Sequence, residues 1–111
     1  MASHPSFSIV APVYGVERYI ANCADSLLGQ TYDNIQFIFV NDGTKDASIA
    51  LLEKLIDEKY SFLKDRIVIV NKHNEGLPAA RRTGMEYVTG DYVLHVDSDD
   101  WVEKDMVAKI A

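Results

Sequence analysis

Residues 92–101 read Tyr-Val-Leu-His-Val-Asp-Ser-Asp-Asp-Trp, a short apolar run that leads into three carboxylates. The apolar part, Tyr92 to Val96, is typical of a buried strand. A strand that ends in acidic residues presents them at the rim of a sheet, where a hard divalent cation and the phosphates of a nucleotide can meet. This stretch therefore predicts a metal and phosphate site at one edge of a sheet.

Three other apolar, β-rich runs precede this stretch, at residues 7–11, 35–40 and 67–70. Apolar residues at helical spacing fill the intervals between them. They predict one helix over residues 16–30, a second that Asp46 caps and that ends near Tyr60, and a third from about 74 that takes Pro78 in its first turn and stops at Gly90. A last helix is expected from about Glu103.

Four strands joined by three helices imply right-handed crossovers. The sequence therefore predicts an α/β fold with a Rossmann-like, mainly parallel sheet and helices on both faces. With 111 residues, 48% of them hydrophobic, the chain is expected to form one domain over residues 1–111.

Charge and cysteine content narrow the class of partner and the compartment. The net charge of -6 argues against nucleic acid or an anionic membrane as the main partner, because either would favour a basic surface. The single cysteine, Cys23, excludes an internal disulfide and favours a reducing compartment. No apolar segment approaches the roughly 20 residues that span a bilayer, and no signal peptide is evident. We expect a soluble, cytoplasmic chain.

In a parallel sheet, ligands bind beyond the carboxyl ends of the strands. The residues that follow the four expected strands are mostly polar or acidic, and they should gather at one edge. They are residues 12–15, 41–44, 71–76 and 97–100.

Five segments carry a shared pattern, at residues 9–20, 26–32, 40–46, 74–81 and 90–101. Taken together, they resemble the nucleotide-binding half of the family 2 glycosyltransferases, an inverting family with a GT-A-type fold. The resemblance covers nearly the whole chain. The chain departs from the family pattern at Asn41, where an aspartate is more frequent, and at Gly15, where an asparagine is usual.

The resemblance implies a nucleotide site at the first two strand ends. Pro12, Val13, Tyr14 and Glu17 are implied to line the base and ribose pocket. Asp42 is implied to accept a hydrogen bond from the imide nitrogen of uracil or a comparable base edge.

The resemblance also implies a phosphate and metal site. Arg81 would pair with the phosphates of the donor. Asp97 would reach the ribose or the metal, with Ser98 beside the nucleotide. Asp99 would coordinate the Mn²⁺ or Mg²⁺ that bridges the two phosphates, within an Asp-x-Asp motif.

The implied reaction is hexosyl transfer with inversion, from a nucleoside diphosphate sugar to a saccharide or lipid-linked acceptor in polysaccharide biosynthesis. We favour uridine over guanosine or thymidine as the base. The general base of such a reaction is expected beyond Ala111, so residues 1–111 are expected to be the amino-terminal portion of a longer enzyme, with donor binding and little turnover. The cytoplasm, or the cytoplasmic face of a membrane reached through further segments, is the implied location.

Simpler readings of the same residues remain open. The acidic run could cap a helix before Glu103, Asp42 could serve the turn at Gly43, and Arg81 could be a solvated helix residue. Trp101 could stack on a sugar, although packing between the last helix and the sheet is favoured. A non-catalytic nucleotide-binding module also stays open. A receiver-like phosphoacceptor domain is disfavoured, because it needs an acidic pair directly after the first strand.

Overall fold

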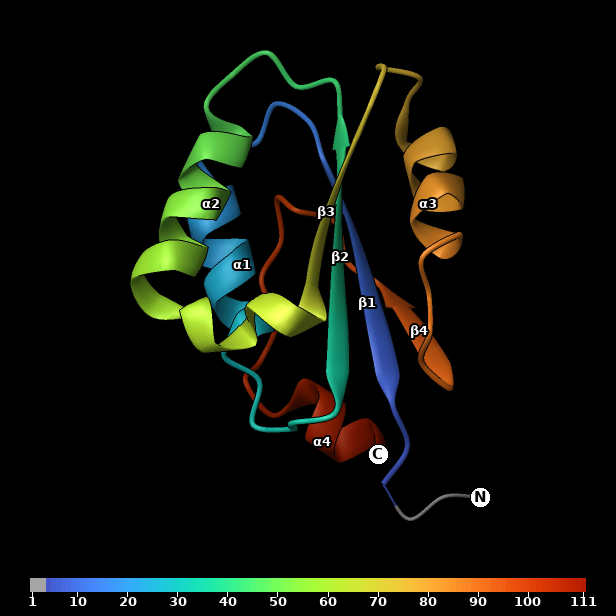
Figure 1. Cartoon of the computed structure of the whole chain (residues 1–111). Helices are drawn as coiled ribbons and strands as arrows, with labels where there is room; N and C mark the ends of the chain where they lie inside the picture. The colour runs from blue at the N-terminus through green and yellow to red at the C-terminus, as the bar shows by residue number, and fades with distance from the viewer. Residues whose placement is uncertain (1–3) are drawn as a thin grey trace.

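Four parallel strands form one sheet in the order β3-β2-β1-β4 (Figure 1). The structure is a computed structural model, and it describes residues 4–111. The strands are β1 (Phe7–Val13), β2 (Ile35–Asp42), β3 (Ile67–Lys72) and β4 (Tyr92–His95). Because β1 pairs in parallel with both β2 and β4, the ends of these three strands reach the same edge of the sheet. The expected mainly parallel sheet is confirmed.

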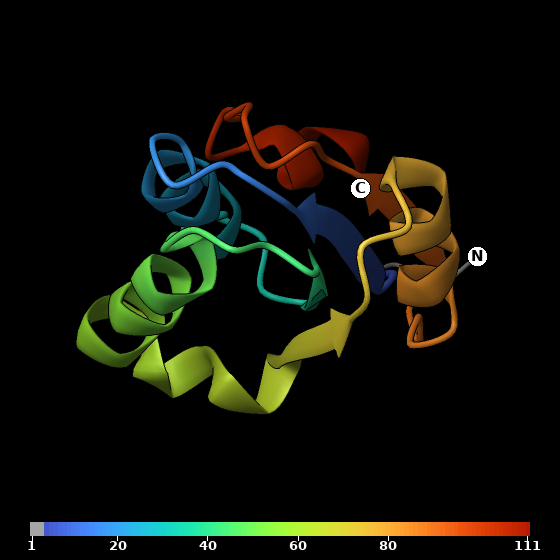
Figure 2. The ribbon, with the colours of Figure 1, turned by 90° about the horizontal axis from the view of Figure 1, so that it is seen from above.

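Helices cover both faces of this sheet, also as expected (Figure 2). On one face lie α1 (Ile20–Leu28) and α2 (Ser48–Lys59), and on the other lies α3 (Leu77–Met85). A short 3-10 helix, η1 (Ser61–Arg66), precedes β3, and α4 (Met106–Ile110) lies near the amino ends of the strands.

Alternation along the two central strands produces a separate core on each face of the sheet. In β1, Ile9 and Val13 face α1 and α2, whereas Val10 faces α3. In β2, Phe39 faces α1 and α2, and Ile38 faces α3. Successive side chains of a strand point to opposite faces, so a strand buried on both sides must be apolar at every position. This explains the continuous apolar runs of β1 and β2. The edge strands β3 and β4 are mostly half-buried or exposed, so the expectation that residues 67–70 and 92–96 form buried strands was wrong.

The first helix begins later than its apolar stripe predicts. Residues 16–19 form a turn, in which the N–H groups of Tyr19 and Ile20 both donate to the carbonyl oxygen of Val16, at 2.8 Å each. The stripe continues through this turn because Val16 still packs against the core. The last helix likewise begins at Met106 rather than near Glu103.

Gly90 does not end a helix, because α3 stops at Met85, with Glu86 as its C-cap. Gly90 instead lies against β1. A Cβ atom there would come within 2.8 Å of the backbone of both Phe7 and Ser8. The glycine is required by this close approach of two chain segments, a cause that local sequence does not reveal. Pro78 does lie in the first turn of α3, as expected.

Within residues 4–111, none of the helices combines the length and hydrophobicity that crossing a membrane demands.

Candidate functional site

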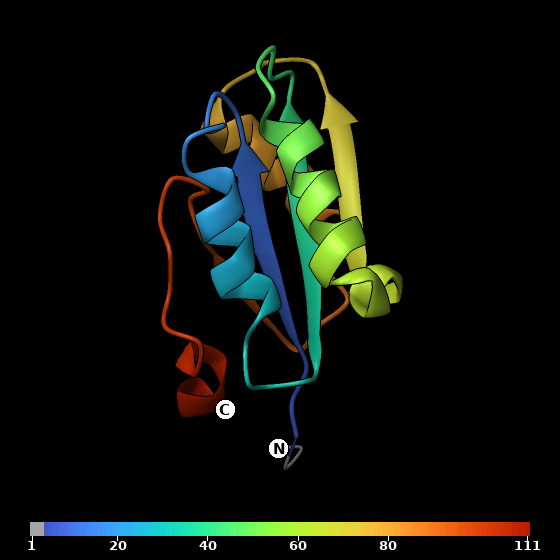
Figure 3. The ribbon, with the colours of Figure 1, turned by 90° about the vertical axis from the view of Figure 1, so that its left-hand side faces the viewer.

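The loops that follow the strands gather at the carboxyl edge of the sheet (Figure 3). The β1–α1, β2–α2 and β3–α3 loops lie side by side there, and the segment after β4 starts beside them. The α/β topology places them together, because each loop leaves the same end of a parallel strand. Residues distant in sequence can therefore share one ligand.

The acidic run forms a cluster at this edge. Asp97, Asp99 and Asp100 each offer a carboxylate oxygen, and these oxygens lie within 4.8 Å of one another. A hydrogen bond joins the run to β1, since the Ser98 hydroxyl donates to the carbonyl oxygen of Pro12 at 2.5 Å. Clustered carboxylate oxygens are the donor set that Mg²⁺ and Mn²⁺ prefer. The chemistry of these residues therefore fits a hard divalent cation.

Arg81 reaches the acidic run from α3. Its Nη2 donates to Oδ1 of Asp97 at 2.8 Å, and the two side chains are 37% and 47% exposed. A guanidinium has five N–H donors, so this pair leaves others available to a phosphate. The structure thus brings the expected phosphate and metal residues into contact.

A cavity of about 140 Å³ connects the acidic run with the end of β1. It holds five of the residues assigned from the sequence, namely Pro12, Tyr14, Asp97, Ser98 and Asp99, together with Val16 and Leu77. Tyr14 is 49% exposed, so a ligand can reach its ring. Ser98 is buried and its hydroxyl is used by Pro12, so a nucleotide contact by Ser98 stays a prediction.

Two other assigned residues, one at the end of β1 and one in the loop after it, do not line this cavity. Val13 is fully buried and packs in the core under α1 and α2, so a nucleotide could reach only its backbone. Glu17 is exposed, and its N–H donates to Oδ2 of Asp46 at 3.3 Å. A ligand contact by either residue stays a prediction.

Asp42 is buried, with 1% of its surface exposed. Its carboxylate accepts the N–H groups of Glu75 and Gly76 at 3.0 Å each, and Lys72 Nζ lies 3.5 Å from Oδ1. The Asn74 amide donates to the Asp42 carbonyl oxygen at 3.1 Å. Asp42 therefore fastens the β3–α3 loop to the end of β2. A hydrogen bond from Asp42 to a base would require these bonds to rearrange, so that contact stays a prediction.

Lys72 and Glu75 complete this arrangement and were not singled out from the sequence. Lys72 Nζ donates to Oε1 of Glu75 at 2.7 Å. This hydrogen bond lowers the pKa of the Glu75 carboxyl, and the same bond raises the pKa of Lys72. The signal was the sequence 71–76 after β3, where a lysine and a glutamate stand three positions apart.

Trp101 does not pack between the last helix and the sheet, as the sequence favoured. It is 60% exposed and borders a cavity of about 510 Å³ beside Arg81, Asp97 and Asp100. The prediction was wrong because the segment after Asp100 runs down the side of the molecule before α4 begins, as Figure 3 shows.

Cys23 lies directly under the acidic run. Its Sγ is 3.8 Å from the carbonyl oxygen of Asp97. Burial, and then the charges of Asp100, Asp99 and Asp97, raise the pKa of the thiol to about 12. The thiol is therefore neutral at physiological pH, which agrees with the expected packing role.

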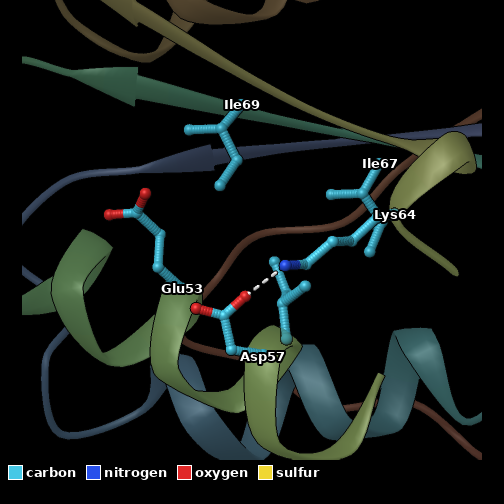
Figure 4. Close-up of a pocket in the computed structure, with 6 residues that line it drawn as sticks. Glu53, Asp57, Lys64, Ile67 and Ile69 are labelled. Atoms are coloured by element: carbon cyan, nitrogen blue, oxygen red, sulfur yellow. Dashed lines mark ion pairs between the residues drawn. The ribbon is translucent and has the colours of Figure 1, made fainter. Parts of the chain in front are cut away.

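A cavity of about 340 Å³ lies elsewhere, between α2, η1 and β3 (Figure 4). An ion pair crosses it, with Lys64 Nζ 2.6 Å from Oδ1 of Asp57. None of the residues that line it was assigned to the site, and they belong to α2, η1 and β3 rather than to the loops at the carboxyl edge of the sheet. The cluster at Asp97 to Asp100 is therefore the stronger candidate.

Comparison with known proteins identifies the family of the chain. Residues 8–111 match the family model described as "Glycosyl transferase family 2". The chain is 44% identical over 100 residues to the glycosyltransferase GlyA of Streptococcus pneumoniae serotype 4, and the match covers 90% of this chain and 14% of GlyA.

Solved structures with the same fold extend the comparison. S. aureus TarS 1-349 in complex with UDP-GlcNAc has a TM-score of 0.82 and 27% identity, over 95% of this chain and 30% of that one. The mannosyltransferase PcManGT of Pyrobaculum calidifontis, in complex with GDP-Man and Mn²⁺, has a TM-score of 0.84 and 20% identity, over 96% of this chain and 31% of that one. The expected GT-A-type fold is confirmed, and the chain spans less than a third of each of these proteins.

Proposed function

The chain belongs to glycosyl transferase family 2, and from this premise we propose that it binds a nucleoside diphosphate sugar together with Mn²⁺ or Mg²⁺, as the donor site of a glycosyltransferase. The observation that carries the proposal is the cluster of Asp97, Asp99 and Asp100, whose oxygens lie within 4.8 Å of one another beside the Arg81 guanidinium. In a metal-bound diphosphate, the carboxylates can bind the cation and the guanidinium can bind the phosphates.

In this proposal Asp99 and Asp97 hold the cation. A cation there would neutralise the charge that develops on the departing nucleoside diphosphate. Arg81 would bind the phosphates through the donors that Asp97 does not use. The cavity beside Tyr14 and Pro12 would take the ribose or base, and Glu17, Val13 and Ser98 would border the nucleotide through exposed or backbone atoms.

Asp42 keeps a place in the proposal as the acceptor for a base N–H group. Its carboxylate already binds the N–H groups of the β3–α3 loop, so it would act on the base only by exchanging one of these bonds. We therefore assign the greater share of donor affinity to the acidic run and to Arg81.

A UDP-sugar is the donor that we favour. TarS, which is 27% identical to this chain, binds UDP-GlcNAc, and PcManGT holds GDP-Man and Mn²⁺ on the same fold. Transfer with inversion to a saccharide or lipid-linked acceptor is our proposal for the whole reaction. The lone, buried cysteine suits a reducing compartment, so we propose that the reaction takes place in the cytoplasm or at the cytoplasmic face of a membrane.

Calorimetric titration tests the donor site. UDP-GlcNAc and GDP-Man would each be titrated into the chain with Mn²⁺ and with EDTA. Binding should need the metal, and Asp99→Ala should weaken it by about 2 kcal/mol, roughly thirtyfold, through the loss of a charged ligand. Asp57→Ala is the matched control, because it removes an equal charge from the cavity between α2 and β3. Equal affinities for Asp99→Ala and the unchanged chain would exclude the site.

A further inference from the structure

The β1–α1 loop is held by side chains of the neighbouring β2–α2 loop and of the first residue of α2. Three consecutive N–H groups of the β1–α1 loop each donate to one of these side-chain oxygens. The pairs are Gly15 N with Thr44 Oγ1 at 2.9 Å, Val16 N with Ser48 Oγ at 3.0 Å, and Glu17 N with Asp46 Oδ2 at 3.3 Å. These N–H groups lie ahead of α1, which begins at Ile20, so no helical hydrogen bond engages them.

Asp46 is the centre of this arrangement. Its Oδ1 accepts the hydroxyls of Thr44 at 2.7 Å and Ser48 at 2.6 Å, and also the N–H of Ser48 at 3.0 Å. A hydroxyl has one proton, so a hydroxyl that donates to Asp46 must present lone pairs to its other neighbour. The carboxylate thus makes both hydroxyls acceptors for the β1–α1 loop.

The carboxyl group of Asp46 stays ionised. The hydroxyls of Ser48 and then Thr44 lower the pKa of its carboxyl to about 2. The group is therefore ionised at any physiological pH, and its hydrogen bonds are of the stronger, charge-assisted kind. A neutral amide at position 46 would present an N–H group of its own in place of one oxygen, so it could not accept all of these bonds.

The held loop carries part of the proposed donor site. Tyr14 directly precedes the three fastened residues, and its side chain borders the cavity that also contains Asp97 and Asp99. Asp46 is absent from the lining of that cavity. The side chain of Asp46 therefore contacts the loop without lining this cavity.

We infer that Asp46 is a positioning residue, which acts through Thr44 and Ser48 to fix the β1–α1 loop so that Tyr14 stands beside the acidic run. This inference rests on the proposed donor site. It assigns to Asp46 an effect on nucleotide affinity without any contact with the nucleotide, and it leaves the metal-binding carboxylates unaffected.

Binding measurements separate positioning from general structural support. Mn²⁺ alone, and then UDP and GDP with Mn²⁺, would be titrated into Asp46→Asn. Nucleotide affinity should fall roughly tenfold or more, as for the loss of a charge-assisted hydrogen bond, while affinity for Mn²⁺ alone stays within about twofold of the unchanged chain. Equal losses for the nucleotide and for Mn²⁺, or no loss for either, would overturn the inference.

A second pair of variants guards against a folding defect at Asp46. Thr44→Val removes the hydroxyl and keeps the side-chain volume, whereas Thr44→Ser keeps the hydroxyl. Thr44→Val should weaken nucleotide binding, and Thr44→Ser should bind the nucleotide nearly as well as the unchanged chain. Tyr60→Phe is the matched control, because it removes a hydroxyl that donates to Oδ1 of Asp25 at 2.5 Å. Tyr60 is the C-cap of α2, at the opposite end of that helix from Ser48. If Tyr60→Phe weakens the nucleotide as much as Thr44→Val, the effect is merely structural and the inference fails.

Amide hydrogen exchange tests the positioning independently of any ligand. In Asp46→Asn, the N–H groups of residues 15–17 should exchange roughly tenfold faster or more, while those of β1 and β2 keep their relative protection. Unchanged exchange at residues 15–17 would overturn the inference, whatever the titrations show. If the unchanged chain binds neither nucleotide, the proposed donor site fails, and the exchange result still decides whether Asp46 holds the loop.

Discussion

Two acidic positions flank the end of β1, and their environments are opposite. At the end of β2, Asp42 is 1% exposed and its carboxylate accepts two backbone N–H groups with Lys72 nearby. After β4, Asp97 and Asp99 belong to an exposed cluster in which carboxylates face one another. Sequence alone treated both positions as ligand contacts.

The difference shows how one residue type serves two purposes at a sheet edge. A buried carboxylate that is fully hydrogen-bonded stabilises the loops around it, because removing it leaves donors without partners. Exposed carboxylates held close together repel one another, and a bound cation would relieve that repulsion. The first kind builds the site, and the second kind is suited to ligand binding.

The largest effect is expected at Asp42. Asp42→Ala should lower the free energy of unfolding by about 3 kcal/mol, because the N–H groups of Glu75 and Gly76 would lose their acceptor and Lys72 would lose one of its two carboxylate partners. Urea denaturation followed by circular dichroism measures this loss. Asp42→Asn keeps the shape and one acceptor oxygen, so its loss should be about half as large. A loss below about 1 kcal/mol for the alanine would mean that the buried carboxylate does not hold the loop.

Asp46 is an intermediate case, part-exposed but fully hydrogen-bonded, and pH reveals its contribution. Its folded pKa is lowered to about 2 from an unfolded value near 4. The stabilisation is therefore present above about pH 4 and is lost as the pH falls through 2. Asp46→Asn should be less stable than the unchanged chain by about 1 kcal/mol at pH 6, after allowance for solvent screening. The gap should close below about pH 2, and a gap that is constant with pH would contradict this account.

Asp99 should behave in the opposite sense. Asp99→Asn removes one of the mutually repelling charges, so it should raise the free energy of unfolding by about 0.5 kcal/mol in EDTA. The increase should shrink in 1 M NaCl, which screens exposed charges. Adding Mn²⁺ should reverse the order, because the unchanged chain would gain more from binding the metal. Thermal unfolding with and without Mn²⁺ measures both effects. If Asp99→Asn is less stable than the unchanged chain in EDTA, Asp99 stabilises the fold as Asp42 does, and this account is wrong.

The strands and the acidic run were predictable because local pattern determines them. Continuous apolar runs indicate strands, and residues 97–100 follow such a run directly. The buried state of Asp42 was not predictable, since its donors come from Glu75 and Gly76, more than thirty positions away. The close approach of Gly90 to β1 and the exposure of Trp101 depend in the same way on segments that meet only in the folded chain.

The smallest effect is expected at Lys64, and it tests whether burial or distance governs these carboxylates. Lys64 Nζ lies 2.6 Å from Asp57, nearer than Lys72 Nζ lies to Asp42 at 3.5 Å. The side chains of Lys64 and Asp57 are 57% and 63% exposed, whereas those of Lys72 and Asp42 are 12% and 2% exposed. An exposed pair gains little because water already solvates both charges, so Lys64→Met should change the free energy of unfolding by less than about 0.5 kcal/mol in urea denaturation. A loss as large as that of Asp42→Ala would mean that the length of the ion pair, rather than the burial of its carboxylate, sets the contribution to stability.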